Sequence, residues 1–403
     1  MADASIPRPW LTIVGIGEDG PDGLPPASRR ALESAELVVG AKRHLALLRE
    51  LKVETVEWPV PFADGPPLLL SYRGRRVVAL ASGDPFWFGA GTVIVRDLDP
   101  TEWCALPGPS TFSRAAACLG WPLERTLCLG LHAAPLTRLR LYLAPGVRAI
   151  VLLRDGDAVR ALGSMLTETG FGASGLTVLE ALGGPRERIT RATADSLPDW
   201  TCTHPVAVAL EVAGDGASVP AASGIADAFF ESDGQITKRP VRALALSALA
   251  PRPFETLWDI GGGSGSIAIE WLLSHPTTEA VSIEARPDRA ARIRVNADRL
   301  GVDRLRVVEA AAPAALDGLP APHAVFIGGG LSEALLSDLT ARLAPGTRLV
   351  AHAVTLGSEA LLSSWSERLG GSLLRVELAE AEPLGARRGW KASYPLVQWR
   401  VTL

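Results

Sequence analysis

The run Trp258-Asp259-Ile260-Gly261-Gly262-Gly263-Ser264-Gly265-Ser266 decides the fold of the C-terminal part of this chain. It is typical of an apolar strand that ends in an acid and continues into a glycine-rich turn and a helix. Glycine lets the backbone turn tightly and approach a ligand closely, and the helix that follows presents its N-terminal amides to that ligand. A second strand, Val281-Ser282-Ile283-Glu284, ends in another acid. This order predicts a doubly wound α/β domain that binds its ligand at the carboxyl ends of the strands.

The two acids indicate which ligand this turn accepts. Glu284 follows the glycines at the spacing where a carboxylate meets the hydroxyls of an adenosine ribose. Asp259 stands two positions before the first glycine, Gly261, where it could accept a hydrogen bond from an amino group. Because a positively charged ligand favours nearby carboxylates, we expect S-adenosylmethionine, with Gly261, Gly263, Gly265 and Ser266 beside it. A dinucleotide-dependent oxidoreductase could use the same glycines and Glu284, and it is the alternative.

The chain is expected to form two domains joined by a linker. Strands alternate with helices over residues 1–212, which predicts parallel sheets in two subdomains of about 1–105 and 106–212. One of the expected helices is Ser28–Val39. Residues 213–224 are Gly, Ala, Ser and Pro with two Asp, which predicts a linker that buries little. A cleaner alternation follows over residues 225–403, opening with a helix at Pro240–Leu249. Two further strands, Ser372–Leu378 and Leu396–Leu403, should close its sheet.

Composition excludes several classes of protein. The 403 residues are 47% hydrophobic and 21% charged, which fits globular domains, and the net charge of −4 argues against a nucleic-acid methyltransferase. The four cysteines form no C-x-x-C pair, so we expect no metal site and no disulfide scaffold, but free thiols in a reducing cytoplasm. The N-terminus does not read as a signal peptide, and no run of eighteen apolar residues exists to span a membrane.

Three stretches of the N-terminal half each join a strand or a helix to a turn. Val14-Gly15-Ile16-Gly17 is a strand that ends in small residues. Ala81-Ser82-Gly83-Asp84-Pro85 is a strand whose ladder must stop at the proline, which exposes backbone groups and a carboxylate at the edge where ligands bind. Pro107-Gly108-Pro109-Ser110 is typical of a helix start capped by Ser110. Each stretch alone is typical of a plain turn, but the three together predict a second ligand-binding site.

These N-terminal motifs resemble the tetrapyrrole methylases of corrin and sirohaem synthesis. Within that family, Val38-Val39-Gly40, Arg43-His44-Leu45 and the run 182–189 are similar to the branch that acts on precorrin-6. The second half resembles the class I methyltransferase domain that accompanies this branch. That resemblance rests on Ile236-Thr237-Lys238-Arg239, Asp259–Ser266, Ala268-Ile269-Glu270-Trp271, Phe326-Ile327-Gly328-Gly329-Gly330 and Val354-Thr355-Leu356.

The resemblance covers nearly the whole chain and implies a fold, a reaction and an assembly. The fold would be α/β, with a two-subdomain tetrapyrrole methylase fold followed by a doubly wound, Rossmann-like class I methyltransferase. The chain would use two S-adenosylmethionine molecules to methylate C-5 and C-15 of precorrin-6B and would remove carbon dioxide from the C-12 acetate, giving precorrin-8X in cobalamin biosynthesis. Both domain types would form homo-oligomers. Alternatives are the cobalt-containing substrate of the anaerobic route and a tetrapyrrole-binding scaffold without activity.

The resemblance also implies cofactor residues, and this chain departs from the family pattern at some of them. The expected cofactor residues are Gly15, Gly17, Gly83, Asp84 and Pro85 in the first half, and Ala311, Ala312 and Gly328 in the second. Related domains carry an acid that faces the adenine in the run where this chain has Ala310-Ala311-Ala312-Pro313. The family's Ser-x-His-Gly run is Gly130-Leu131-His132-Ala133 in this chain.

Reaction chemistry selects the remaining candidates. The meso carbons of a reduced tetrapyrrole are enamine-like, so the protein mainly has to align two reactants, whereas decarboxylation also benefits from a proton donor. Candidate donors are Lys238, Glu270 and His352, with His132 in addition, and Thr237, Arg239 and Ser110 are expected to bind substrate. The alternatives are a surface ion pair for Lys238 and Arg239, a buried hydrogen-bonded carboxylate for Glu270 and a satisfied strand-end imidazole for His352. Arg387, Arg388 and Lys391 could also bind substrate carboxylates, but they are expected on a solvated loop.

Overall fold

The computed structural model describes residues 9–48, 52–199 and 201–403, and these form two compact units. The second unit comprises Pro135–Leu143 and Ser218–Leu403, and the first comprises the rest of the described chain up to Ala217. Among the described residues, no helix combines the length and the apolar character that crossing a membrane requires. The expectation of an α/β protein is confirmed.

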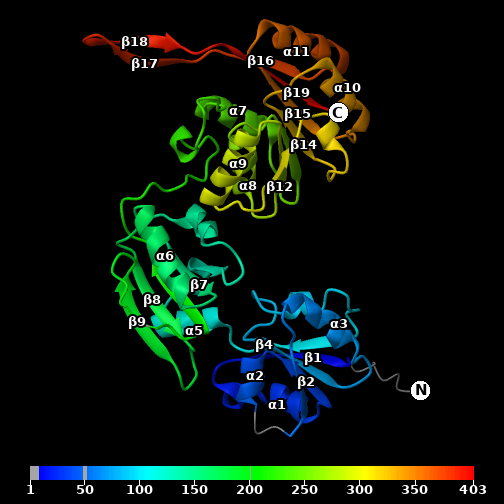
Figure 1. Cartoon of the computed structure of the whole chain (residues 1–403), viewed down its shortest axis with the longest axis vertical. Helices are drawn as coiled ribbons and strands as arrows, with labels where there is room; N and C mark the ends of the chain where they lie inside the picture. Colours follow the sequence, from blue (N-terminus) through cyan, green and yellow to red (C-terminus); the bar gives the residue numbers. More distant parts are fainter. Residues whose placement is uncertain (1–8, 49–51, 200) are drawn as a thin grey trace. The chain divides into compact units, whose positions relative to one another are not determined.

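The first unit begins with a parallel sheet of five strands in the order β3-β2-β4-β1-β5 (Figure 1). Its strands are β1 (Leu11–Ile16), β2 (Leu37–Gly40), β3 (Glu54–Glu57), β4 (Val77–Ser82) and β5 (Trp103–Leu106). Its helices are α1 (Pro26–Glu33), α2 (Lys42–Leu47), α3 (Gly65–Leu70) and α4 (Gly91–Ile94), with 3-10 turns η1 (Gly20–Gly23) and η2 (Phe62–Asp64). The expected helix Ser28–Val39 is wrong in its second half, because Val38 and Val39 pair with β4 as strand β2. β-branched residues fit such a buried strand.

The second sheet of this unit corrects the expectation of parallel pairing. Its order is β6-β7-β10-β8-β9, and only β6 and β7 are parallel, whereas β10 runs antiparallel to β7 and β8. The strands are β6 (Leu127–Gly130), β7 (Arg148–Leu153), β8 (Gly175–Glu180), β9 (Arg188–Thr193) and β10 (Val206–Glu211). The helical elements of this part are α5 (Thr111–Leu119), η3 (Leu123–Arg125) and α6 (Gly156–Glu168), whereas η4 (Leu136–Tyr142) belongs to the second unit. The connection between β8 and β9 contains no helix, which suits their antiparallel pairing, because parallel neighbours need a longer crossover.

The second unit is built on a seven-stranded sheet in the order β13-β12-β11-β14-β15-β19-β16. The strands are β11 (Thr256–Ile260), β12 (Glu279–Glu284), β13 (Arg306–Glu309), β14 (Ala324–Ile327), β15 (Arg348–Ala353), β16 (Ser372–Val376) and β19 (Leu396–Thr402). The first five are parallel, and β19 runs antiparallel to β15 and β16. Strand order reverses between β11 and β14, so their carboxyl ends flank the crevice where doubly wound sheets bind ligands.

Helices cover both faces of this sheet. Alternate residues along β11 show the pattern: Leu257 joins one apolar cluster with α7, α8 and α9, whereas Trp258 joins another with α10 and α11. These helices are α7 (Arg239–Leu249), α8 (Ser266–Ser274), α9 (Pro287–Arg299), α10 (Glu333–Arg342) and α11 (Leu356–Leu369), with η5 (Asp227–Phe229) and η6 (Ala314–Leu316) between other elements.

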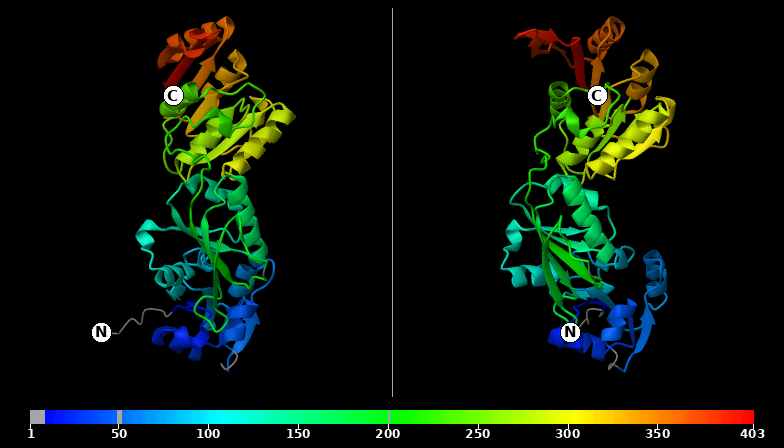
Figure 2. Two further views of the ribbon diagram at one scale, coloured as in Figure 1. Left: turned by 90° about the vertical axis from the view of Figure 1, so that its left-hand side faces the viewer. Right: turned by 60° about the vertical axis from the view of Figure 1, so that its left-hand side comes forward.

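A hairpin between β16 and β19 was not expected. Strands β17 (Ala379–Leu384) and β18 (Arg387–Ala392) pair only with each other and stand clear of the rest of the second unit (Figure 1; Figure 2, right). Arg387, Arg388 and Lys391 therefore lie on a strand, which corrects the expected loop.

The expected linker 213–224 also needs a correction. Val219 is buried in an apolar cluster of the second unit, and Gly224 is buried beside α8. Residues 218–224 therefore belong to the second unit instead of bridging two domains freely.

Candidate functional site

The second unit holds a cavity of about 990 Å³ at the carboxyl ends of its parallel strands. The glycine-rich turn after β11 forms its floor, and the backbone there needs glycine. Gly261, Gly263 and Gly265 have φ of +72°, +61° and +77°, which side chains strongly disfavour. A side chain on Gly261 would also lie 2.6 Å from the Gly329 backbone. The cavity is thus lined by backbone that a ligand can approach closely.

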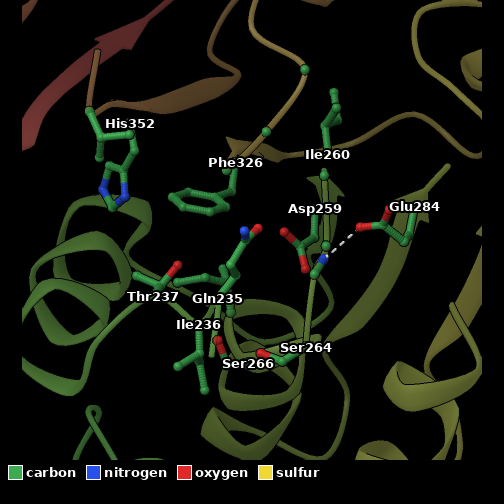
Figure 3. A pocket seen from close by; sticks show the side chains of 18 of the residues that line it. Gln235, Ile236, Thr237, Asp259, Ile260, Ser264, Ser266, Glu284, Phe326 and His352 are labelled. Carbon is green, nitrogen blue, oxygen red and sulfur yellow. Dashed lines mark hydrogen bonds between the residues drawn. The ribbon is translucent and has the colours of Figure 1, made fainter. Parts of the chain in front are cut away.

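Asp259 lies at the centre of this cavity and is almost fully buried (Figure 3). Its Oδ2 lies 3.3 Å from the hydroxyl of Ser282, which donates to it. Burial raises the pKa of Asp259 to about 7, and the nearby charge of Glu284 adds to that rise. A buried carboxylate of this kind is stabilised by a cationic ligand, which replaces the lost hydration.

Glu284 ends β12 and faces the same glycine turn. Its Oε2 accepts from the Gly263 amide at 2.9 Å (Figure 3), and its Oε1 accepts from the Arg286 amide at 2.9 Å. These two bonds fix the carboxylate, and each oxygen keeps a further lone pair for a ligand.

A segment before α7 forms another side of the cavity. Gly234, Gln235, Ile236, Thr237 and Lys238 all line it. The Asn296 side chain, fully buried, holds the segment to the turn because it bonds both the backbone of Glu231 and the carbonyl of Ser264 at 2.8–2.9 Å. Arg289, which also lines the cavity, donates to Asp233 and Gln235. The sequence offered no signal for Asn296 beyond its position on an otherwise apolar helix stripe.

Glu270 does not face the cavity, which corrects its assignment as a candidate proton donor. Its carboxylate accepts from the amides of Gly224 and Ile225 and from Arg242, whose guanidinium is fully buried. Arg242 also donates to the carbonyl oxygens of Ile225 and Thr237. The pair of Glu270 and Arg242 therefore anchors the segment that leads to Lys238. This agrees with the alternative stated for Glu270, a buried hydrogen-bonded carboxylate. The sequence alone predicted no role for Arg242. The available signal was its position on the apolar face of the expected helix Pro240–Leu249.

Some of the other candidates for proton donation and substrate binding line the cavity, and others do not. Lys238 and Thr237 line the cavity, with the Lys238 ammonium 3.9 Å from Asp227, but Arg239 is exposed and does not line it. His352 lies at the far end of the cavity from Glu284, beyond Phe326 (Figure 3), and its Nε2 is 2.9 Å from Gln398 Oε1. Burial lowers the pKa of His352 to about 4. His352 lines the cavity, but a neutral imidazole bonded to Gln398 is a poor acid, which favours the alternative of a satisfied strand-end residue.

The remaining expected cofactor residues of the second unit mostly lie where predicted. Ser266, Ala311, Ala312 and Gly328 line the cavity with Gly261 and Gly263. Gly265 does not: it sits behind the turn, where a side chain would meet Ile293. Its left-handed backbone serves the turn itself.

The first unit holds a cavity of about 650 Å³ lined by both of its sheets. Three expected turns meet beside it. A side chain on Gly15 would collide with the Gly83 backbone, and the Gly108 amide donates to the Gly83 carbonyl at 3.0 Å. Gly17 and Gly83 line the cavity, whereas Gly15, Asp84, Pro85 and Ser110 do not.

Those four residues have structural tasks in this unit, and their expected ligand contacts stay predictions. Gly15 permits the close packing just described. Asp84 accepts from the Phe86 amide at 2.8 Å, and the Pro85 carbonyl accepts from the Gly91 amide, which together shape the following loop. Ser110 caps α5 by accepting from the Ser113 amide at 3.0 Å, and it is buried.

Charged residues and histidines gather at the cavity of the first unit, and of these His132 was a candidate proton donor. Glu18 lies between Arg43 at 2.5 Å and Arg186 at 3.1 Å, and Arg43 also donates to the Ser82 hydroxyl. His44 Nε2 is 3.2 Å from the same hydroxyl. Burial, aided by the Arg43 charge, lowers the pKa of His44 to about 3, so this imidazole is neutral. Glu18, Arg43, His44, Arg114, His132 and His204 line the cavity.

Comparisons with known proteins match both halves of the chain. Residues 10–198 match the family of Tetrapyrrole (Corrin/Porphyrin) Methylases, and residues 228–403 match the Precorrin methyltransferase domain. A Precorrin-6Y C(5,15)-methyltransferase [decarboxylating] of Sinorhizobium sp is 50% identical over 412 residues, covering 100% of both chains. A protein of the same name from Mycobacterium tuberculosis H37Rv is 41% identical over 97% of this chain and 99% of its own. The crystal structure of the C-terminal domain of precorrin-6Y C5,15-methyltransferase from Rhodobacter capsulatus is 54% identical and aligns with 46% of this chain and 100% of its own, with a TM-score of 0.45.

Proposed function

The chain belongs to the decarboxylating precorrin-6Y C(5,15)-methyltransferases, and from this premise we propose how its two cavities divide the reaction. It is an S-adenosylmethionine-dependent enzyme of cobalamin biosynthesis that methylates and decarboxylates a precorrin. We assign methylation of C-15 and loss of carbon dioxide from the C-12 acetate to the second unit, and methylation of C-5 to the first. The supporting observation is that each unit has its own cavity beside a glycine turn at the carboxyl ends of parallel strands.

The residues of the cavity in the second unit fit S-adenosylmethionine, which supplies a methyl group on a cationic sulfur. Asp259 is a buried carboxylate that faces the cavity and lacks a cationic partner among the described side chains, so a ligand ammonium would suit it. Glu284 would hold the ribose hydroxyls, and Ala311 and Ala312 would lie along the adenine. The glycine backbone at Gly261 and Gly263 allows the close approach.

The protein's main contribution to methyl transfer is alignment. A reduced tetrapyrrole supplies its own carbon nucleophile, so neither site requires a strong base. Holding two reactants in line can lower the barrier by roughly 7–11 kcal/mol. The glycine turns and the residues that fix them, such as Asn296, are the parts of the chain suited to this task.

Decarboxylation requires a proton for the methylene carbon that loses carbon dioxide, and we assign its delivery to Lys238. Lys238 lines the cavity beside Thr237, which would hold the acetate arm, whereas Glu270 does not line it and Arg289 is bonded to Asp233 and Gln235. The variant Lys238→Met should methylate the ring but decarboxylate at least about tenfold more slowly, a modest loss for general acid catalysis. The neighbouring cation Arg239 does not line the cavity, so Arg239→Met is the matched control and should retain both steps. Equal loss in both variants would remove Lys238 from this role.

The experiment that tests the function follows precorrin-6B by mass spectrometry in the presence of labelled S-adenosylmethionine. The expected product carries two labelled methyl groups and has lost one carbon dioxide. Calorimetry should give two S-adenosylhomocysteine molecules per chain, one for each cavity. A single binding site would contradict the assignment to two cavities.

We further propose a homo-oligomer assembled through the β17–β18 hairpin, in the cytoplasm. The hairpin exposes Leu384 and Trp390, with Tyr394 following it 90% exposed. An isolated two-stranded hairpin is marginal in water, and such apolar exposure is typical of an interface. Light scattering should show an oligomer that Trp390→Ser weakens. The four unpaired cysteines agree with a reducing compartment.

A further inference from the structure

The loop after β4 places Phe88 in a backbone conformation that a phenylalanine rarely adopts. Its φ is +54°, in the left-handed region where non-glycine residues are uncommon. The surrounding loop enforces this geometry, because Asp84 accepts from the Phe86 amide and the Pro85 carbonyl accepts from the Gly91 amide. Strained residues of this kind persist where their surroundings fix them, and they cluster at ligand sites.

The strained backbone directs the Phe88 ring into the cavity of the first unit. Phe88 lines this cavity yet is 48% exposed, so its ring is not absorbed into the core. One part of the ring packs near Phe112, with centroids 5.8 Å apart. Another part occupies the space of a side chain at Gly130, where a Cβ atom would lie 2.6 Å from the ring. The absence of a side chain at 130 therefore lets the ring take this position.

The cavity combines this aromatic ring with other flat apolar groups and with cations. Trp58 and Phe62 also line it and stack on each other, with centroids 4.9 Å apart and an angle of 27° between the rings. Arg43 and Arg114 line the same cavity. Flat aromatic faces and guanidinium groups together suit a ligand that has a conjugated plane and carboxylate arms.

We propose that Phe88 is a specificity-determining residue of the first unit, whose ring stacks on the conjugated face of the tetrapyrrole during C-5 methylation. This inference rests on the proposed function, because it requires the tetrapyrrole to enter this cavity. The fold holds a strained phenylalanine at 88 because the side chain must leave the loop in this direction. A glycine would relieve the backbone but would remove the ring from the cavity.

The experiment compares variants of the full chain in C-5 methylation of the precorrin, with the methylated carbon identified by 13C-labelled methyl groups. Phe88→Gly keeps the left-handed backbone without strain and removes the ring. The KM for the tetrapyrrole should rise between about threefold and tenfold, the size of one lost aromatic contact, while kcat and the S-adenosylhomocysteine affinity stay unchanged. Phe88→Tyr should retain the wild-type KM. Gly130→Ala puts a methyl group into the space that the Phe88 ring occupies. It should raise the KM for the tetrapyrrole although the Phe88 side chain is still present.

Phe86 provides the matched control. It stands two residues away in the same loop, is 43% exposed and packs against Trp103, but it does not line the cavity. Phe86→Ala should therefore leave the KM unchanged. An unchanged KM in Phe88→Gly would overturn the proposal, as would a loss of S-adenosylhomocysteine affinity that matches the rise in KM. A wild-type chain that never methylates C-5 would instead contradict the proposed function.

Discussion

Asp259 and Glu284 end neighbouring parallel strands, and their carboxylates share one cavity with no cation bonded to either among the described side chains. Two such groups repel each other, and burial makes the charged form of Asp259 costly. The site is therefore suited to a positively charged ligand. Its affinity for that ligand should depend on pH.

We predict that S-adenosylhomocysteine binds the second unit more tightly as pH rises. The pKa of Asp259 is raised to about 7 in the free protein, and the ligand's ammonium should lower it in the complex, so binding releases a proton below pH 7. Affinity should increase about tenfold between pH 6 and pH 8 and then level off. The pKa of His352, lowered to about 4, keeps that residue neutral over this range.

Calorimetry in buffers of different ionisation enthalpy measures both the affinity and the proton released. Asp259→Asn is the control, since it keeps the shape of the side chain but does not titrate. If the affinity of Asp259→Asn still rises with pH, the released proton comes from another group.

We predict that Glu284→Ala weakens S-adenosylhomocysteine binding to the second unit by about 1–3 kcal/mol, the range for hydrogen bonds to a charged group. Loss of the carboxylate removes the proposed ribose contact and also frees the Gly263 amide that it holds. Titration of the full chain should show one weakened and one unchanged site. Two unchanged sites would show that Glu284 takes no part in binding.

At the scale of elements, the segment from Ile225 to Lys238 depends on helices α7 and α8 for its position. Arg242 of α7 is fully buried, and it joins Glu270 of α8 to backbone carbonyls of the segment. Buried ion pairs add little net stability, but removal of one partner leaves the other charge buried and unpaired. The pair therefore specifies the position of the segment more than it stabilises the fold.

We predict that Arg242→Leu lowers the unfolding free energy of the second unit by about 3–5 kcal/mol, because it leaves Glu270 unpaired. The double variant Arg242→Leu/Glu270→Leu should recover a large part of this loss. Differential scanning calorimetry of the full chain would follow the corresponding transition. Arg239→Leu, an exposed arginine on the same helix, is the control and should change little; a double variant less stable than Arg242→Leu would contradict this account.

At the scale of the whole molecule, the two units should fold and bind cofactor separately, because each has its own apolar clusters and its own cavity. We predict that a fragment starting at Ser218 binds S-adenosylhomocysteine and converts precorrin-6B to a ring with one added methyl group and one carbon dioxide lost. Mass spectrometry of the product would show this.

The same fragment should be less stable than the second unit in the full chain. It lacks Pro135–Leu143, where Arg138 forms a bidentate ion pair with Asp303 at 2.7 and 2.9 Å. Arg138→Ala in the full chain isolates this contribution. A folded fragment that binds S-adenosylhomocysteine but changes the ring in neither way would show that the two units share one site.

The sequence by itself determined the α/β class, the glycine-rich turn after β11 and most of the residues that line the cavity beside it. Glycines at left-handed positions and acids at strand ends are requirements of local geometry, so the strand–turn–helix pattern of 258–266 and the end of β12 at Glu284 carry them directly. Only the tertiary structure decided the roles of Glu270, Arg242 and Asn296, since a buried polar side chain is defined by partners distant in sequence. The antiparallel pairing of β10 and the placement of 218–224 were likewise decided by long-range packing. Phe88 shows the reason most clearly: its residue type predicts burial in a core, and only the folded loop turns its ring into a cavity.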